Sequence, residues 1–261
     1  MADLRVNRWE NNGISALVLE NGGEKHSRLI VLLHGYQGDA VSNLEFGKTL
    51  LSADESAVVA VFDGVEEVPD RHDPHIRQWW DLPPFEGRYY AAMPLFAPKS
   101  VRPALDAIVR DAHKTAVRLN AAVLELMREK KLKTLVLAGI SQGGITAFEM
   151  ALFCSELTSV LDGVVIIGAG IAGADRLRKT AVNPVPFLLV RGMKDEIFPP
   201  SVNCFSKSVL TEAGVPVVAQ AVDSPHFGLE HAAAGEVRAF ISGLERKKST
   251  KGASPCLTLP R

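Results

Sequence analysis

The chain has 261 residues, 47% of them hydrophobic and 23% charged, and its formal net charge at pH 7 is −1. These values are typical of a globular protein with a sizeable core, and the near-neutral charge argues against a partner such as nucleic acid or an anionic membrane. No apolar run reaches the roughly 18 residues of a membrane span, and the N-terminus lacks a signal-peptide core. We therefore expect a cytoplasmic protein without stable membrane insertion.

The cysteine and histidine spacings give no indication of a metal site. The three cysteines, Cys154, Cys204 and Cys256, are widely separated, which predicts neither a zinc site nor a disulfide framework. His72 and His75 flank an Asp-Pro pair, but the proline prevents a helix that would align the two imidazoles, and no third ligand stands out. We therefore expect no metal and no cofactor.

Apolar runs and amphipathic segments alternate along the chain. The expected strands are residues 14–19, 28–34, 57–62, 134–138, 163–168, 185–190 and 215–222. The expected helices are residues 41–53, 101–130 with Ser100 as its cap, 143–153, 199–212 and 229–244. Several of the strands are continuous apolar runs, which suit strands that are buried on both faces. The alternation therefore predicts an α/β fold with a mostly parallel central sheet and helices on both faces.

Two segments lack this regular pattern. Residues 63–100 are rich in proline, aromatic and charged residues, and a segment this long without periodicity is uncommon unless it has a function. We interpret it as one wall of a substrate cleft or as a lid, with Trp79 and Trp80 as substrate-binding residues. Residues 245–261 are basic and have little to bury, which predicts a disordered tail. A single domain is therefore expected over residues 1–244.

Residues 139–143, Gly-Ile-Ser-Gln-Gly, match the G-x-S-x-G pattern between a predicted strand and a predicted helix. In that setting the motif is a nucleophile elbow. The sharp turn requires a strained backbone at the serine, and side chains at Gly139 and Gly143 would collide with the neighbouring strand and helix. The turn also directs the N–H of Gln142 and the helix N-terminus toward the place where an oxyanion would form. Ser141 is therefore the predicted nucleophile.

A serine nucleophile needs a base that takes its proton and a carboxylate that orients the base. In the hydrolase fold these groups follow the serine in the order acid, then histidine. Two histidines follow Ser141, and His226 comes directly after a predicted strand, whereas His231 lies in a predicted helix. Asp195 and Glu196 compete as the acid in the loop after another strand, and Asp195 is the preferred candidate.

The loop at residues 34–39, His-Gly-Tyr-Gln-Gly-Asp, follows an early predicted strand. Its two glycines let the backbone fold tightly and leave N–H groups unpaired, and the hydrolase fold places its second oxyanion donor in such a loop. We assign that N–H to Tyr36, with Gln37 as the alternative donor and as a substrate-binding residue. His34 precedes the loop, so we interpret it as a structural hydrogen-bonding residue rather than a catalytic base.

Three stretches stand out in combination. They are Leu33-His34-Gly35 with Gly38-Asp39 just after, Arg-Gln-Trp-Trp-Asp-Leu at residues 77–82, and Gly-Ile-Ser-Gln-Gly-Gly at residues 139–144. Together they resemble the phospholipase/carboxylesterase family, which includes the acyl-protein thioesterases, and the resemblance runs from about residue 28 to residue 243. The chain departs from the family pattern in having a longer oxyanion loop, Pro225 before the histidine and an apparent insertion at residues 83–99.

The resemblance implies an α/β-hydrolase fold and assigns the catalytic roles to particular residues of this chain. The implied triad is Ser141, Asp195 and His226, and the implied oxyanion donors are Tyr36 and Gln142. The resemblance implies an esterase or thioesterase that cleaves small-molecule or acylated substrates through an acyl-enzyme, without a cofactor. The alternatives are a lysophospholipase or a peptidase on the same fold, or a non-catalytic protein that binds a ligand on a hydrolase scaffold.

Overall fold

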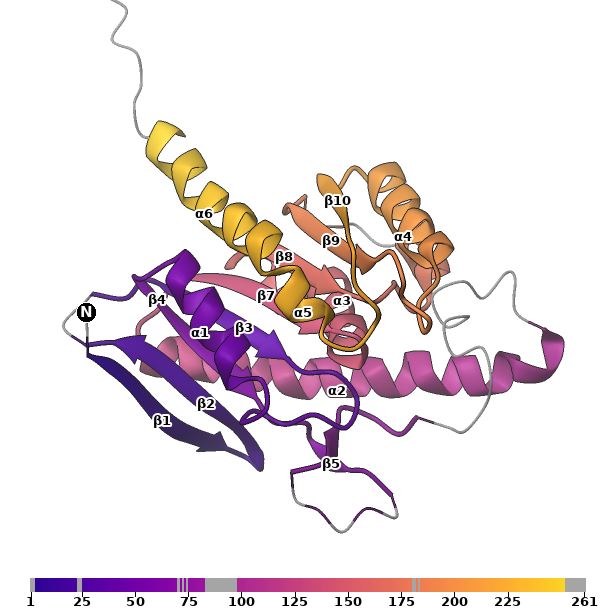
Figure 1. Ribbon diagram of the computed structural model, residues 1–261, viewed down its shortest axis with the longest axis horizontal. Helices are drawn as coiled ribbons and strands as arrows, with labels where there is room; N and C mark the ends of the chain where they lie inside the picture. The colour runs from indigo at the N-terminus through magenta and orange to yellow at the C-terminus, as the bar shows by residue number, and fades with distance from the viewer. Residues whose placement is uncertain are drawn as a thin grey trace, which may run out of the picture.

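The computed structural model describes residues 3–22, 25–69, 71, 73, 75–82, 98–179, 182 and 184–251 of the chain. Within these residues a central sheet of eight strands has the order β1-β2-β4-β3-β7-β8-β9-β10 (Figure 1). The strands are β1 (Leu4–Asn11), β2 (Ile14–Asn21), β3 (Arg28–Leu33), β4 (Ala57–Phe62), β7 (Thr134–Ile140), β8 (Leu161–Ile167), β9 (Phe187–Gly192) and β10 (Val217–Val222).

Neighbouring strands in the series β4-β3-β7-β8-β9-β10 pair in parallel, whereas β1 and β2 form an antiparallel extension at one edge. The predicted mostly parallel sheet is therefore confirmed. Every residue of β3 and of β4 is buried, as expected for apolar strands with helices on both faces of the sheet. Strand β1 was not predicted, although Asn12 and Gly13, which join it to β2, both have positive φ angles and form the Asn-Gly pair typical of tight hairpins.

Helices cover both faces of the sheet, each with its own apolar core (Figure 1). Helices α2 (Arg102–Glu129), α3 (Gln142–Phe153) and α4 (Pro200–Glu212) pack on one face. Helices α1 (Leu44–Ala53), α5 (Leu229–Ala232) and α6 (Ala234–Lys251) pack on the other. The fold class predicted from the sequence, a sheet between two helical layers, is therefore confirmed.

Two predicted helix ends are wrong. Ser100 does not cap α2, because a 3₁₀ turn, η3 (Lys99–Val101), leads into the helix and Val101 occupies the cap position without a side-chain hydrogen bond. The last helix continues from the predicted end at Leu244 to Lys251, so the first part of the expected disordered tail is helical. Lysine and arginine are good helix formers, and a helix can continue in solvent beyond its last packed residue. Residues 252–261 lie outside the described residues.

The irregular segment 63–100 is described in part. It contains a two-stranded ribbon of β5 (Glu66–Glu67) and β6 (Arg77–Gln78). Residues 83–97, which hold part of the expected lid and most of the expected insertion, lie outside the described residues. His72 also lies outside them, and the described residues contain no group of three side chains that could hold a metal ion. Among the helices of the described chain, none is long and apolar enough to cross a membrane.

Candidate active site

Ser141 lies in the tight turn between β7 and α3, with the backbone angles φ 52° and ψ −116°. A non-glycine residue rarely adopts such angles, so the backbone is strained at this position, as the motif predicts. A Cβ atom at Gly139 would collide with the backbone of Gly143, and a Cβ at Gly143 would collide with the carbonyls of Leu33 and His34. The glycines of the motif are therefore required by close approach of the backbone, as expected.

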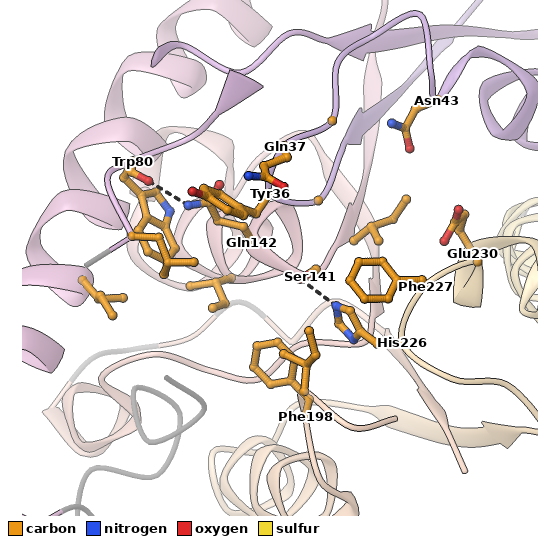
Figure 2. Close-up of a pocket in the computed structure, with 18 residues that line it drawn as sticks. Tyr36, Gln37, Asn43, Trp80, Ser141, Gln142, Phe198, His226, Phe227 and Glu230 are labelled. Atoms are coloured by element: carbon orange, nitrogen blue, oxygen red, sulfur yellow. Dashed lines mark hydrogen bonds between the residues drawn. The ribbon is translucent and has the colours of Figure 1, made fainter. Parts of the chain in front are cut away.

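Three loops at the carboxyl ends of the strands bring the predicted triad together, and Figure 2 shows the contact of two of its members, Ser141 and His226. The Oγ atom of Ser141 lies 3.0 Å from Nε2 of His226, and Nδ1 of the same imidazole lies 2.9 Å from Oδ2 of Asp195. The side chains of His226 and Asp195 are 7% and 0% exposed. The sequence separations are 85 and 31 residues, so the chain order and the fold, not local sequence, produce this contact.

The competition between Asp195 and Glu196 for the imidazole is resolved by the loop after β9. The second carboxylate oxygen of Asp195 accepts hydrogen bonds from the backbone N–H groups of Ile197 and Phe198, at 2.9 and 2.7 Å. These bonds fix the position of the carboxylate and leave its other oxygen directed to the imidazole. Glu196 instead accepts a hydrogen bond from the backbone N–H of His226 at 3.2 Å, so it contacts the loop and not the ring.

Two backbone N–H groups near Ser141 are available for an oxyanion. Gln142 is the first residue of α3, where the helix leaves its N–H without an intrahelical acceptor. In the loop after β3, the N–H of Gln37 donates to the carbonyl of Arg77 at 3.0 Å, whereas the N–H of Tyr36 has no acceptor within the described part of the chain. This geometry favours Tyr36 over Gln37.

A family model for phospholipases and carboxylesterases matches residues 15–236, most of the chain. The chain belongs to the phospholipase/carboxylesterase family. No curated protein sequence matches it significantly.

Solved esterases share the fold of this family member. Esterase PE8 superposes with a TM-score of 0.69 at 19% identity, over 93% of this chain and 99% of that one. A carboxylesterase from Mesorhizobium loti gives 0.67 at 15% identity over 91% and 99%. The Bacillus cereus carboxylesterase gives 0.64 at 16% identity over 90% and 95%. At sequence identities this low, the likeness shows a shared fold alone.

In this family member the side chain of Gln142 binds the backbone of two tryptophans. Its Oε1 accepts a hydrogen bond from the N–H of Trp79 at 3.0 Å, and its Nε2 donates to the carbonyl of Trp80 at 2.8 Å (Figure 2). The sequence predicted a role for the backbone of Gln142 and missed the role of its side chain. Neither hydrogen bond leaves a signal in the sequence, because both use backbone groups of the partner.

Trp79 does not contact the cavity, contrary to its predicted role in substrate binding. Its side chain is fully buried, and its indole N–H donates to the carbonyl of His34 at 2.7 Å. A large indole with a satisfied N–H is best placed in the core, and Trp79 therefore supports the oxyanion loop from behind. Trp80 and Gln37, the other predicted substrate contacts, do line the cavity.

His34 has the structural role that the sequence predicts. Its Nε2 accepts a hydrogen bond from the N–H of Gly64 at 2.8 Å, so the proton of the neutral ring is on Nδ1, which donates to the carbonyl of Gly35 at 2.7 Å. Burial lowers the pKa of His34 below its ordinary value because the charged ring would lose its hydration. The neutral imidazole thus links the oxyanion loop to the loop after β4.

Ser141 opens onto a cavity of about 460 Å³ with two chemically different ends (Figure 2). One end is apolar and is lined by Trp80. The other aliphatic and aromatic lining residues are Leu82, Ile108, Ile145, Ile197 and Phe198, of which Phe198 stacks on the imidazole of His226. The other end holds the polar side chains Asn43 and Glu230 together with the ring of Phe227, whereas Gln37 lines the cavity beside Tyr36 (Figure 2). The sequence indicated neither Asn43 nor Glu230, because each lies outside any motif and reaches the cavity only through the fold.

Proposed function

We propose that the protein is a serine hydrolase that cleaves carboxylic esters or thioesters through an acyl-enzyme intermediate. The observation that carries this proposal is the contact of 3.0 Å between Ser141 Oγ and His226 Nε2, with Asp195 bound behind the imidazole. A serine hydroxyl becomes a useful nucleophile when a base in this position removes its proton during attack. Membership of the phospholipase/carboxylesterase family supports the same reaction class.

In the proposed mechanism His226 takes the proton of Ser141 as Oγ attacks the carbonyl carbon of the substrate. Asp195 keeps the Nδ1 proton directed toward itself and stabilises the imidazolium that forms. The N–H groups of Tyr36 and Gln142 donate to the oxyanion, and one such donor is worth about 10²–10³ in rate. The imidazolium then protonates the departing alcohol or thiol. Water, activated by the same histidine, releases the acid.

The apolar end of the cavity supports an acyl group as the part of the substrate held there. Its aliphatic and aromatic walls would remove a hydrocarbon chain from water, and each buried methylene stabilises the complex by about 0.8 kcal/mol. A short chain would fill the cavity partly, so the dependence of rate on chain length measures its depth. We propose carboxylic acids of small to medium size as the acyl component.

The test is hydrolysis of p-nitrophenyl esters whose acyl chains range from two to sixteen carbons, with Ser141→Ala beside the wild type. We expect turnover by the wild type and a loss of about 10⁴-fold or more in kcat/KM for the variant. Ser155→Ala, which removes an exposed serine hydroxyl beyond the C-terminal end of α3, whereas Ser141 precedes its N-terminal end, is the matched control and should keep full activity. An acyl-thioester of the optimal chain length then tests for thioesterase activity.

Intact-mass measurement during turnover provides a second readout. We expect the mass of one acyl group on the wild type and none on Ser141→Ala. A fluorophosphonate probe should likewise label Ser141. If the wild type hydrolyses no ester and takes up no label, the proposal is wrong and the protein binds ligands without catalysis.

A further inference from the structure

The polar end of the catalytic cavity contains a carboxylate that the hydrolytic mechanism does not use. Glu230 is the one acidic residue that lines the cavity, and no lysine or arginine lines it, among the residues that the structure describes. Its side chain is 19% exposed. A carboxylate that is largely removed from water needs a partner, because burial of an unpaired charge is unfavourable.

Glu230 has little compensation from the protein. Within the described residues the nearest cationic group is Nε2 of His231, which lies 3.5 Å from one carboxylate oxygen and belongs to a side chain that is 65% exposed. That distance is too long for a strong hydrogen bond. The other oxygen of Glu230 has no protein donor in the described chain, so it can accept from a ligand.

Two neighbours of Glu230 suit the same kind of ligand. Asn43 uses its Nδ2 group for hydrogen bonds to the carbonyl of Asp39 and to Ser42, which leaves its Oδ1 as an acceptor at the cavity. Phe227 is 75% exposed although it lines the cavity, and an aromatic face attracts cations. A carboxylate, an amide oxygen and an open aromatic ring together select a positively charged group.

The polar end lies on the leaving-group side of Ser141. The leaving group must reach His226, since Nε2 of this residue supplies its proton. Phe227 follows His226 directly in the chain, and Glu230 is four residues after His226. Figure 2 shows Phe227 beside the imidazole, Glu230 beyond Phe227, and Trp80 at the opposite side of Ser141. The apolar end therefore suits the acyl group, and the polar end suits the alcohol or thiol.

We infer that Glu230, with Asn43 and Phe227, binds a cationic leaving group, so that the preferred substrates are esters or thioesters of amino alcohols or aminothiols. This inference rests on the proposed esterase function and names its substrate class. Glu230 acts as a specificity residue: it attracts and orients the ammonium group and takes no part in proton transfer. The attraction is electrostatic, so salt should weaken it.

The test compares two esters of the same acid that differ in charge and hardly in shape: a choline ester and the 3,3-dimethylbutyl ester. We expect the wild type to favour the choline ester by about tenfold or more in kcat/KM at low salt. Glu230→Gln should lower kcat/KM for the choline ester by about tenfold and change that for the neutral ester by less than about twofold. Glu212→Gln, the same charge change on the exposed surface of α4, is the matched control and should alter neither.

Binding of tetramethylammonium gives a readout that does not depend on turnover. Saturation-transfer NMR should detect its methyl protons at the wild-type protein and at Ser141→Ala, and the signal should be lost in Glu230→Gln. Hydrolysis of both esters with equal efficiency by the wild type, or an equal loss for both in Glu230→Gln, would overturn the inference. If neither ester is cleaved but the ion still binds through Glu230, the esterase proposal fails and the cation site stands. An absence of binding would overturn the site itself.

Discussion

Two parts of the candidate active site are built in opposite ways. The elbow at residues 139–143 is a contiguous turn, and its glycines are required by the close approach of backbone from the turn itself and from the end of β3. The strip at residues 77–80 is joined to the site by hydrogen bonds between distant segments. The carbonyl of Arg77 accepts from the N–H of Gln37, and the backbone of Trp79 and Trp80 pairs with the side chain of a residue more than 60 positions away.

This difference between the elbow and the strip shows which parts of a candidate active site can be recognised from the amino-acid sequence. The elbow restricts residue types, because only glycine fits beside the strand and helix, and therefore leaves a motif. The strip contributes mainly backbone groups, which every sequence possesses, and yet it contacts both segments that carry the candidate oxyanion N–H groups. It is therefore a positioning element that the sequence does not show. The following substitutions separate the two parts by the size of their effects.

The largest effect is expected in the triad, from Asp195→Asn. An amide in place of the carboxylate would donate to the imidazole or hold the wrong tautomer, and a loss of about 10⁴-fold in kcat is expected. Steady-state kinetics on the best p-nitrophenyl ester measures it. Glu196→Gln is the matched control: it keeps an acceptor for the N–H of His226, and a loss below about tenfold is expected. Similar losses in both variants would contradict the assignment of Asp195 as the acid.

An intermediate effect is expected where the strip meets the elbow, from Gln142→Leu. The substitution leaves the N–H of Trp79 and the carbonyl of Trp80 buried without partners. The free energy of unfolding should fall by about 2–4 kcal/mol, as measured by urea denaturation. The rate should fall by about 10–10²-fold, because an oxyanion donor is displaced from its working position.

Gln78→Leu is the control for this substitution, because Gln78 is equally buried in the same strip but its Nε2 bonds only to the carbonyl of Glu67. Its Oε1 has no hydrogen-bond partner in the described chain, so less is lost. We expect a smaller loss of stability and nearly unchanged kcat. An unchanged rate in Gln142→Leu, despite its lower stability, would show that the strip stabilises the fold without positioning the oxyanion loops.

The smallest effect is expected from pH, acting through His34 behind the oxyanion loop. Burial lowers its pKa in the folded state below the ordinary value of 6.5, so the unfolded chain binds the proton more readily. The stability that the neutral ring contributes is complete above pH 6.5 and decreases as the pH falls below that value. Protonation of Nε2 would also break the hydrogen bond from Gly64.

Urea denaturation across about pH 5 to 8 measures this contribution. His34→Gln has no titrating ring, so the free energy of unfolding should decrease less steeply on acidification in the variant than in the wild type. The difference in stability between the two proteins should therefore narrow as the pH is lowered. A difference that stays constant over the whole range would contradict a linkage through this histidine.

The sequence by itself determined the layered fold and pointed to Ser141, Asp195 and His226 as the candidate triad. Continuous apolar runs indicated buried parallel strands, and the G-x-S-x-G turn required a nucleophile after one of them. Because parallel strands end at the same edge of a sheet, the residues that follow later strands, Asp195 and His226, were expected beside Ser141. Their contacts of 2.9 and 3.0 Å have that origin.

Only the tertiary structure decided which N–H groups are unoccupied, which aromatic ring is buried and which charge reaches the cavity. The carbonyl of Arg77 occupies the N–H of Gln37 and leaves Tyr36, and the core encloses Trp79 while Trp80 lines the cavity. Glu230 enters the site from a short helix after the last strand. These outcomes depend on backbone hydrogen bonds and on the packing of segments that are remote in sequence. Neither restricts residue type enough to leave a pattern that can be read from the chain.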